Sequence, residues 1–191
     1  MAKINFNNVI LISGSGRNCG KTTVACHIIS QLAKADQVTG LKISPHFHIT
    51  ENKQVLVYED HRFSIYRELD TRSGKDSSRM LVAGASSVYF VRCTDNDLPL
   101  IYNVLRKLIP ENSPIVCESG AFASSYNPGY HILVVGENAD ETKESYISNL
   151  DRANEIILQE DFSLEAINSQ VNYNSGEWQI KKVMQNTLNM K

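Results

Sequence analysis

Apolar and polar residues follow two alternating patterns along this chain. Short runs rich in Val, Ile and Leu predict strands at residues 9–13, 38–43, 87–91, 114–117, 132–135 and 155–158. Between several of these runs, apolar residues recur at the spacing of a helix. Strands that alternate with helices usually form a parallel sheet covered on both faces. The pattern therefore predicts a doubly wound α/β fold, with a mostly parallel sheet as the middle of three layers.

The predicted helices begin and end at recognisable residues. They occupy residues 21–35, 76–84, 97–109 and 162–167. Asp76 and Asp97 are the expected N-caps, because a short carboxylate side chain accepts hydrogen bonds from the first amides of a helix. Gly84 and Pro110 mark two expected helix ends, since Gly adopts the left-handed conformation and Pro cannot continue a helix.

One stretch, residues 44–71, lacks a clear period. It mixes Pro, His and alternating charges, although residues 55–58 indicate one extra strand. We interpret this stretch as an irregular insertion near the functional site. The chain shows no repeat and no low-complexity tract, and its 191 residues have the length of one domain. We therefore expect residues 1–191 to form a single domain.

Composition narrows the classes of protein. No uninterrupted apolar run has the length of a membrane span, and the first residues lack the apolar core of a signal peptide. We therefore expect a cytoplasmic protein with no membrane partner. The formal net charge is −2, and residues 137–165 hold nine acidic and two basic side chains, so nucleic acid is not an expected partner. The four cysteines form no C-x-x-C pair and are expected to be reduced thiols.

A glycine-rich segment joins the first predicted strand to the first predicted helix. It reads Gly14-Ser15-Gly16-Arg17-Asn18-Cys19-Gly20-Lys21-Thr22-Thr23, and a strand-to-helix junction is the context in which a phosphate-binding loop (P-loop) occurs. Glycine lets the backbone approach a phosphate closely, and the first amides of the following helix attract the anion. The expected cofactor-binding residues are Ser15, Gly16, Arg17, Asn18, Cys19, Gly20, Lys21, Thr22 and Thr23.

Three positions in this segment have distinct expected roles. Lys21 would place a positive charge on the terminal phosphates and is a catalytic candidate. Thr22 would offer its hydroxyl to Mg²⁺, which bridges phosphate oxygens. Ser15 stands where the G-x-x-x-x-G-K-[ST] pattern has its first glycine, and Gly14 and Gly16 flank it. The alternative interpretation is a capped glycine turn with a solvated lysine.

A nucleotide site also needs a carboxylate close to the metal ion or the attacking group. Glu118 directly follows the strand predicted at residues 114–117. It therefore lies at the carboxyl end of a buried strand, where ligands bind in open α/β sheets. We predict Glu118 as a metal ligand together with Thr22, and as a catalytic residue together with Lys21. The alternative is a surface glutamate that begins a loop.

Other charged residues are candidates for contacts with phosphate or substrate. They are Lys42 at the end of the second strand, and Asp70, Lys75, Asp76 and Arg79 around the start of the short helix. Helix caps, surface ion pairs and solvated side chains are the alternative explanation. His46 and His48 alternate around Phe47 and could share a metal ion, but the sequence shows no third ligand.

Several motifs, taken together, resemble those of one family. In order they are Gly20-Lys21-Thr22-Thr23, Gly40-Leu41-Lys42, a loop with histidines, Gly74-Lys75-Asp76-Ser77, Ala83-Gly84-Ala85 and Glu118-Ser119-Gly120-Ala121-Phe122. This order resembles the adapter proteins of molybdopterin-guanine dinucleotide biosynthesis, the MobB family, which is related to the dethiobiotin-synthetase and nickel-insertion group. The resemblance implies a P-loop GTP-binding protein with Mg²⁺ and weak hydrolysis. Its implied partner is the nucleotidyltransferase that attaches GMP to molybdopterin.

Alternatives remain open at this point. The residues do not distinguish GTP from ATP, because the region after the fifth predicted strand has no Asn-Lys-x-Asp pattern that reads guanine. One alternative function is a small-molecule kinase or ATP-dependent ligase, in which Lys42 and residues 70–79 hold the acceptor. Another is a nucleotide-gated scaffold whose segment 44–71 becomes ordered on binding. A homodimer is kept as an alternative to a monomer.

Overall fold

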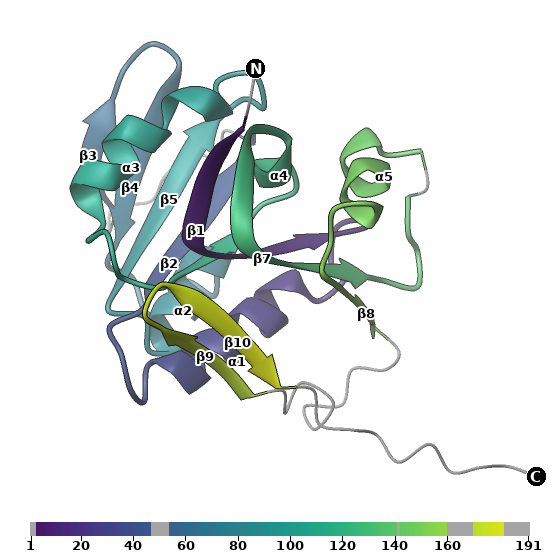
Figure 1. Ribbon diagram of the computed structural model, residues 1–191. Coiled ribbons are helices and arrows are strands. Elements are labelled where there is room, and N and C mark those ends of the chain that lie inside the picture. The colour runs from purple at the N-terminus through teal and green to yellow at the C-terminus, as the bar shows by residue number, and fades with distance from the viewer. Residues whose placement is uncertain (1–2, 47–53, 141, 160–169, 182–191) are drawn as a thin grey trace, which may run out of the picture.

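The computed structural model describes residues 3–46, 54–140, 142–159 and 170–181. An eight-stranded sheet forms their centre, in the order β3-β4-β5-β2-β6-β1-β7-β8 (Figure 1). The strands are β1 (Ile4–Gly14), β2 (Thr39–Ser44), β3 (Gln54–Glu59), β4 (Phe63–Glu68), β5 (Ser87–Cys93), β6 (Ile115–Glu118), β7 (Tyr126–Val135) and β8 (Glu155–Leu158). All pairs from β5 to β8 are parallel, whereas β3 and β4 join the β5 edge as antiparallel strands. The predicted α/β fold with a mostly parallel sheet is confirmed.

Helices cover both faces of this sheet. They are α1 (Lys21–Leu32), α2 (Asp76–Val82), the 3₁₀ turn η1 (Leu98–Leu100), α3 (Tyr102–Leu108), α4 (Phe122–Ser125) and α5 (Glu144–Leu150). One buried cluster packs α1, α2 and a separate hairpin, β9 (Gln170–Asn174) with β10 (Glu177–Lys181), against one face. A second cluster packs η1, α3 and α4 against the other. The arrangement is consistent with three α/β/α layers. Within the described residues, no helix is both long and apolar enough to cross a lipid bilayer.

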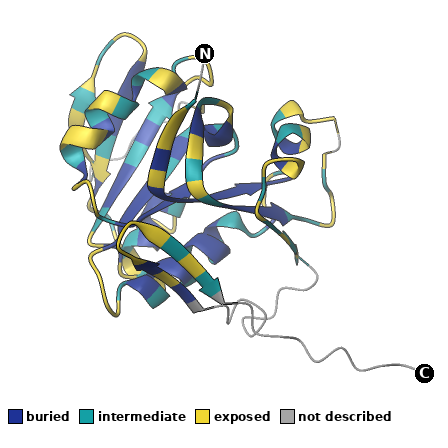
Figure 2. Cartoon of the chain, viewed as in Figure 1, coloured by how far each residue is buried: buried dark blue, intermediate teal, exposed yellow. Residues whose placement is uncertain are grey.

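Strand β1 lies between these two buried clusters. Successive side chains of a strand point to opposite faces, and Leu11 belongs to the cluster beside α3, whereas Ile10 and Ile12 belong to the cluster beside α1. All three residues are fully buried, and Figure 2 shows buried residues along the central strands. Burying one such side chain stabilises a fold by about 1.5–3 kcal/mol. A continuous apolar run therefore suits a central strand of this sheet.

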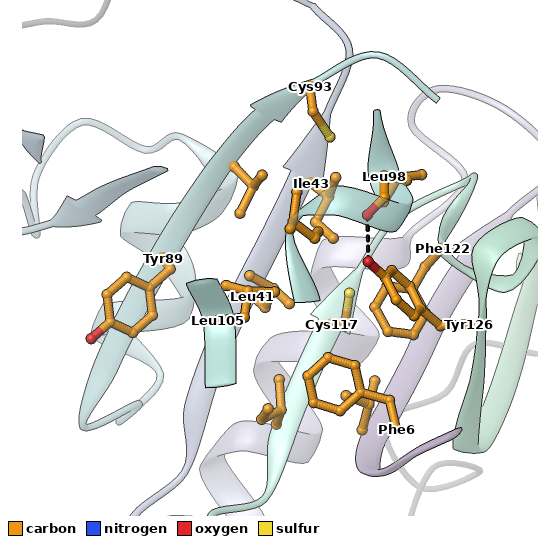
Figure 3. Close-up of a cluster of buried hydrophobic side chains, with 14 of the residues drawn as sticks. Phe6, Leu41, Ile43, Tyr89, Cys93, Leu98, Leu105, Cys117, Phe122 and Tyr126 are labelled. Carbon is orange, nitrogen blue, oxygen red and sulfur yellow. Dashed lines mark hydrogen bonds between the residues drawn. The ribbon is translucent and has the colours of Figure 1, made fainter. Parts of the chain in front are cut away.

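A group of aromatic rings anchors the chain that follows β6 (Figure 3). The ring centroids of Phe122 and Tyr126 are 4.9 Å apart, and Phe6 lies 6.0 Å from each. The Tyr126 hydroxyl donates a hydrogen bond to the carbonyl of Leu98. These contacts join α4, β7 and η1, and they hold the segment directly after Glu118 in place.

The helix predicted over residues 97–109 is split into η1 and α3. The amides of Leu100 and Ile101 each donate to the carbonyl three residues earlier. Pro99 lies inside η1 and has no N–H to donate, which favours this tighter turn. Asp97 takes the predicted N-cap position, at the start of η1, but its carboxylate makes no capping bond and instead accepts a hydrogen bond from Thr94 Oγ1 at 2.7 Å.

The short helix α2 starts differently from the prediction and ends as predicted. Asp76 is its first residue, and Lys75 takes the N-cap position. Gly84 follows the helix with φ of 108°, and its amide donates to the carbonyl of Leu81. Such a bond belongs to a Schellman motif, in which a left-handed glycine closes the helix. The Asp76 carboxylate makes no capping bond within α2, so it is available to other partners.

The segment predicted as an irregular insertion contains a β-hairpin. The extra strand expected at residues 55–58 is confirmed as β3, and β4 was not predicted. Phe63 and Ile65 of β4 are buried in the cluster beside α3. Within the stretch 44–71, the interpretation as irregular is therefore wrong for residues 63–68, because the pairing of β4 with β5 supplies the order that its own sequence does not show.

The C-terminal part of the chain gives mixed outcomes. The strand predicted at residues 155–158 is confirmed as β8, and the helix predicted at residues 162–167 lies outside the described residues. The hairpin β9–β10 was not predicted. Its turn has φ of 52° at Ser175 and 89° at Gly176, the left-handed pair typical of a type I′ turn. Helices α4 and α5 were also missed, since such short segments show little periodicity.

Candidate functional site

Three neighbouring strands bring the predicted site residues to one edge of the sheet. The order β2-β6-β1 places Lys42 beside Glu118, and Glu118 beside Ile12. Because these strands are parallel, their carboxyl ends meet at the same edge. From β1 the chain continues to β2, which lies on one side of β1 in the sheet. From β6 it continues to β7, which lies on the opposite side of β6. Such a reversal is where ligands bind in doubly wound sheets.

The backbone between β1 and α1 makes a tight turn that needs glycine at two places. A Cβ on Gly14 would lie 2.5 Å from Cys19 Sγ and 2.8 Å from Lys21 Cγ. Gly20 has φ of 97°, a left-handed conformation that side chains disfavour. Gly20 is also the N-cap of α1 and makes no side-chain capping bond. The first amides of α1 are therefore suited to an anion.

Lys21 lies across the loop that precedes it. Its ammonium group donates a hydrogen bond to the carbonyl of Gly16, and Nζ also lies 3.4 Å from Cys19 Sγ. Lys21 and Gly16 both line a cleft at this edge of the sheet. The lysine is therefore close to the loop backbone and faces the space in which a ligand of the loop would lie.

Two residues predicted to bind phosphate are buried and are not among the described residues that line the cleft. Ser15 is fully buried: its amide donates to the carbonyl of Val134 at 3.0 Å, and its Oγ accepts from the amide of Gly136 at 3.0 Å. Because that amide is already used, we withdraw Ser15 as a phosphate contact; it ties the loop to β7. Cys19 is 2% exposed and is not among the described residues that line the cleft.

Four polar side chains converge beneath the loop. Thr22 Oγ1 lies 2.9 Å from Glu118 Oε2 and 3.0 Å from Asp76 Oδ1. Lys42 Nζ lies 2.6 Å from Glu118 Oε1 and 2.6 Å from Asp76 Oδ2. Thr22 and Lys42 thus each bridge the same two carboxylates, which come from β6 and α2. We call these four residues the carboxylate cluster.

The surroundings favour the charged forms of Lys42 and Asp76. Burial alone would lower the pKa of Lys42, but the charges of Glu118 and Asp76 outweigh burial and raise it. Burial alone would raise the pKa of Asp76, but the charge of Lys42 and the hydrogen bonds from Lys42 and the Thr22 hydroxyl bring it below its usual value. The Glu118 side chain is 2% exposed and that of Lys42 is 16% exposed. A buried carboxylate requires such a partner, since an unpaired buried charge is costly.

The cluster has the donor atoms that a magnesium ion prefers. Thr22 Oγ1, Glu118 Oε2 and Asp76 Oδ1 are three oxygens from three separate elements, and both carboxylate oxygens lie within hydrogen-bonding distance of the hydroxyl. Mg²⁺ binds oxygen and is usually held by one or two carboxylates, with phosphate and water completing its shell. Among the described residues, no three His, Cys, Asp or Glu side chains gather as a metal centre. The donor set therefore fits Mg²⁺ carried by a phosphate ligand.

The cleft above the cluster has a volume of about 830 Å³. Its described lining includes six cationic side chains, those of Arg17, Lys21, Lys42, Lys75, Arg79 and Lys143. It includes three carboxylates, those of Asp76, Asp95 and Glu118. The excess of positive charge favours an anionic ligand, because a cleft with low-dielectric walls concentrates the field of its charges.

Other predicted residues are divided between the cleft and its surroundings. Lys75 and Arg79 line it, and Arg79 Nη2 donates to Thr23 Oγ1 at 3.2 Å. Asp70 is not among its described lining residues; the Asp70 carboxylate accepts a bond from the amide of Arg72 at 2.9 Å. We therefore withdraw Asp70 as a substrate contact.

The predicted histidine pair is only partly described. His46 lines the cleft, and its Nε2 lies 3.4 Å from Arg17 Nη2. His48 lies outside the described residues. A metal shared by His46 and His48 therefore stays a prediction.

Sequence reasoning missed several residues of this site. Lys143 and Ser145 line the cleft from the start of α5, and Gln54, Phe90 and Asp95 line it from β3, β5 and the turn after β5. The segment after β7 could have been suspected, because it follows the carboxyl end of a central strand. No sequence signal of this kind pointed to Gln54. It reaches the cleft because β3 joins the edge of the sheet, and that position was not predictable from the sequence.

Glu68 is a further residue that the sequence did not reveal. Its carboxylate is 2% exposed and accepts bonds from Ser77 Oγ at 2.6 Å and Gln54 Nε2 at 2.7 Å. It also accepts bonds from the amides of Leu69 and Asp70. Glu68 therefore joins β3, β4 and the start of α2, and it positions the helix turn that carries Asp76.

The chain matches no family model, no curated protein and no solved structure. The resemblance to the adapter family, drawn from short motifs, therefore stays a prediction.

Proposed function

We propose that this protein binds a nucleoside triphosphate together with Mg²⁺, and that residues 14–23 are the phosphate-binding loop of a P-loop fold. The observation that carries the proposal is the position of Thr22. This first-turn residue of α1 follows Gly20 and Lys21, and its hydroxyl lies within 3.0 Å of carboxylate oxygens from both β6 and α2. A loop for phosphate and a site for its metal ion are thus adjacent.

The residues of the loop divide the work of holding the phosphates. The amides of Gly20 and the first turn of α1 would bind phosphate oxygens, and Lys21 would exchange the Gly16 carbonyl for the terminal phosphates. Thr22 Oγ1 and the carboxylates of Glu118 and Asp76 would hold the metal ion. When bound, Mg²⁺ would neutralise part of the phosphate charge.

An adapter with slow hydrolysis is the function we favour. Glu118 lies beside Thr22 and would bind the metal ion when the triphosphate is present, so this carboxylate is poorly placed to activate water. The choice of GTP, and of a molybdopterin nucleotidyltransferase as partner, comes from the motif resemblance alone. A partner role predicts that the protein raises the turnover of a purified nucleotidyltransferase while hydrolysing little GTP by itself.

A specific observation favours a second candidate, phosphoryl transfer to a small acceptor. The cleft extends beyond the loop to Gln54, Phe90 and Asp95, which lie on the side of the hairpin β3–β4. An acceptor bound there would approach the terminal phosphate past Lys42. Rapid turnover that depends on one added metabolite would identify a kinase or ligase, whereas an adapter would show no such dependence.

Titration calorimetry with GTP and with ATP, each with and without Mg²⁺, tests the proposal. We expect saturable binding of at least one triphosphate that strengthens when Mg²⁺ is present. The same titrations decide between guanine and adenine. Absence of binding for both nucleotides at millimolar concentration would refute a nucleotide-binding function.

A further inference from the structure

Lys42 contacts the second oxygen of each of the two carboxylates that would bind a metal ion. Its Nζ is 2.6 Å from Glu118 Oε1 and 2.6 Å from Asp76 Oδ2, while Thr22 Oγ1 bridges the other oxygen of each carboxylate. All four carboxylate oxygens therefore lie within 3.0 Å of an ammonium or hydroxyl group of the chain, and the single hydroxyl proton of Thr22 is donated to one carboxylate at a time. A divalent cation that binds here has to compete with an ammonium group already in contact with both of its ligands.

The ammonium group compensates a charge that the fold cannot leave alone. Glu118 is 2% exposed at its side chain, and Asp76 is held beside it by α2. Two neighbouring carboxylates repel each other, and a buried one is stable only when paired. Lys42 supplies that pairing from within the chain.

The same lysine has a second set of partners within reach when a ligand is bound. Lys42 lies near the carboxyl end of β2, lines the cleft, and stands beside the loop that would hold the phosphates. Phosphate oxygens accept hydrogen bonds from an ammonium group as well as carboxylates do. A flexible four-carbon stem lets it change partners without movement of the sheet.

From this geometry, and resting on the proposed function, we infer that Lys42 acts as a counter-ion lock: its ammonium group competes with a divalent cation for the carboxylates of Glu118 and Asp76. It blocks metal binding to Glu118 and Asp76 until a triphosphate draws the ammonium group away. Metal ion and triphosphate would then bind as a pair, and free Mg²⁺ alone would not occupy the site. The lock prevents the cluster from taking up a divalent cation that carries no nucleotide.

The test uses Mn²⁺ as the probe, because carboxylate and hydroxyl oxygens suit Mn²⁺ as they suit Mg²⁺. Electron paramagnetic resonance measures free Mn²⁺ in titrations of the full chain without nucleotide. We expect Lys42→Met to bind one Mn²⁺ about tenfold or more tightly than the wild type, a typical size for coupling between two ligands. Lys42→Gln, which keeps a hydrogen-bond donor for the carboxylates, should show the same gain and serves if the Met variant does not fold.

Lys143→Met is the matched control, because it removes one positive charge from the lining of the same cleft. A gain in Mn²⁺ affinity for the Lys42 variants that is no larger than for Lys143→Met overturns the lock, since charge alone would then explain it. A triphosphate titration of the wild type separates this failure from that of the proposed function. If the triphosphate binds and the Lys42 variants show no gain, only the lock is wrong.

Discussion

Thr22 Oγ1 and Glu118 Oε2 lie 2.9 Å apart although 96 positions separate the two residues in the chain. The contact follows from the order of strands, because β6 lies directly beside β1, and α1 starts immediately after the loop that leaves β1. A hydroxyl at the start of a helix and a carboxylate at the end of a neighbouring strand thereby face the same space.

Replacing Lys21 by Ala should weaken triphosphate binding by about ten- to a hundredfold, since hydrogen bonds to charged groups contribute about 1.5–3 kcal/mol. The circular dichroism spectrum should not change, because the ammonium group faces the cleft. Titration calorimetry measures the effect. Lys107→Ala, which removes an exposed lysine on α3, is the control and should bind like the wild type. Equal affinity in Lys21→Ala and the control would exclude the loop as the phosphate site.

Replacing Glu118 by Gln should remove most of the dependence of binding on Mg²⁺. The amide keeps the size of the side chain but loses the charge that attracts a metal ion, so affinity in Mg²⁺ should fall by about tenfold, equal to about 1.4 kcal/mol. In excess chelator, the variant and the wild type should bind the triphosphate alike. Glu111→Gln changes a carboxylate that is 71% exposed at its side chain and pairs with Arg106, and it serves as the control. An unaltered Mg²⁺ dependence would place Glu118 outside the metal site.

Replacing Gly20 by Ala should disturb the loop because its φ is 97°. A side chain in the left-handed region costs about 1–2 kcal/mol, which denaturant unfolding can measure. Gly176→Ala introduces the same strain in the β9–β10 turn, where φ is 89° and a Cβ meets nothing within 4 Å. Both variants should lose similar stability, but only Gly20→Ala should lose triphosphate affinity. Intact binding in Gly20→Ala would show that the loop conformation does not matter to the ligand.

His131 should make the fold less stable in mild acid. It is 1% exposed, its Nε2 lies 2.8 Å from Ser13 Oγ, and within the described residues its Nδ1 has no hydrogen-bond partner. Burial lowers the pKa of His131 to about 4, whereas an unfolded histidine titrates near pH 6.5. Between these values only the unfolded chain binds the proton. Stability should therefore fall as pH drops from about 6.5 to 4, by at most about 1.4 kcal/mol per pH unit.

Urea unfolding at a series of pH values between 7.5 and 4.5 measures this slope. His131→Gln cannot titrate, so its stability should depend less on pH than that of the wild type. His61→Gln changes an exposed histidine and is the control substitution. Identical slopes in His131→Gln and the wild type would contradict the assignment to His131.

The parts of the fold that could be predicted are those whose sequence patterns lie within a few residues of one another. The apolar run ending at Gly14, the glycines of the loop and the periodic residues of α1 are adjacent in the chain, and the predicted strand, turn and helix are all present. Strands β2, β5, β6 and β8 were likewise found close to their predicted bounds. Even Glu118 was placed correctly at a strand end, because that position depends only on where β6 stops.

Edge strands and short helices gave weaker signals. β4 is ordered by pairing with β5, and β9 by packing its Val171 and Tyr173 into the cluster beside α1. Ser15 shows the same limit within a motif: its sequence position indicated a phosphate contact, but its amide bonds to β7, which lies more than a hundred residues later. Such partners are invisible until the sheet is assembled.

The sequence by itself determined that the chain forms an α/β fold and that a glycine-rich loop joins its first strand to its first helix. Only the tertiary structure decided that Thr22, Lys42, Asp76 and Glu118 share one polar cluster, with 54 positions between Thr22 and Asp76 and 76 between Lys42 and Glu118. The physical reason is that local preferences set where helices and strands occur, whereas the order and register of strands depend on how their buried faces pack together. Distances between charged groups follow from that packing, and so does the chemistry that they can support.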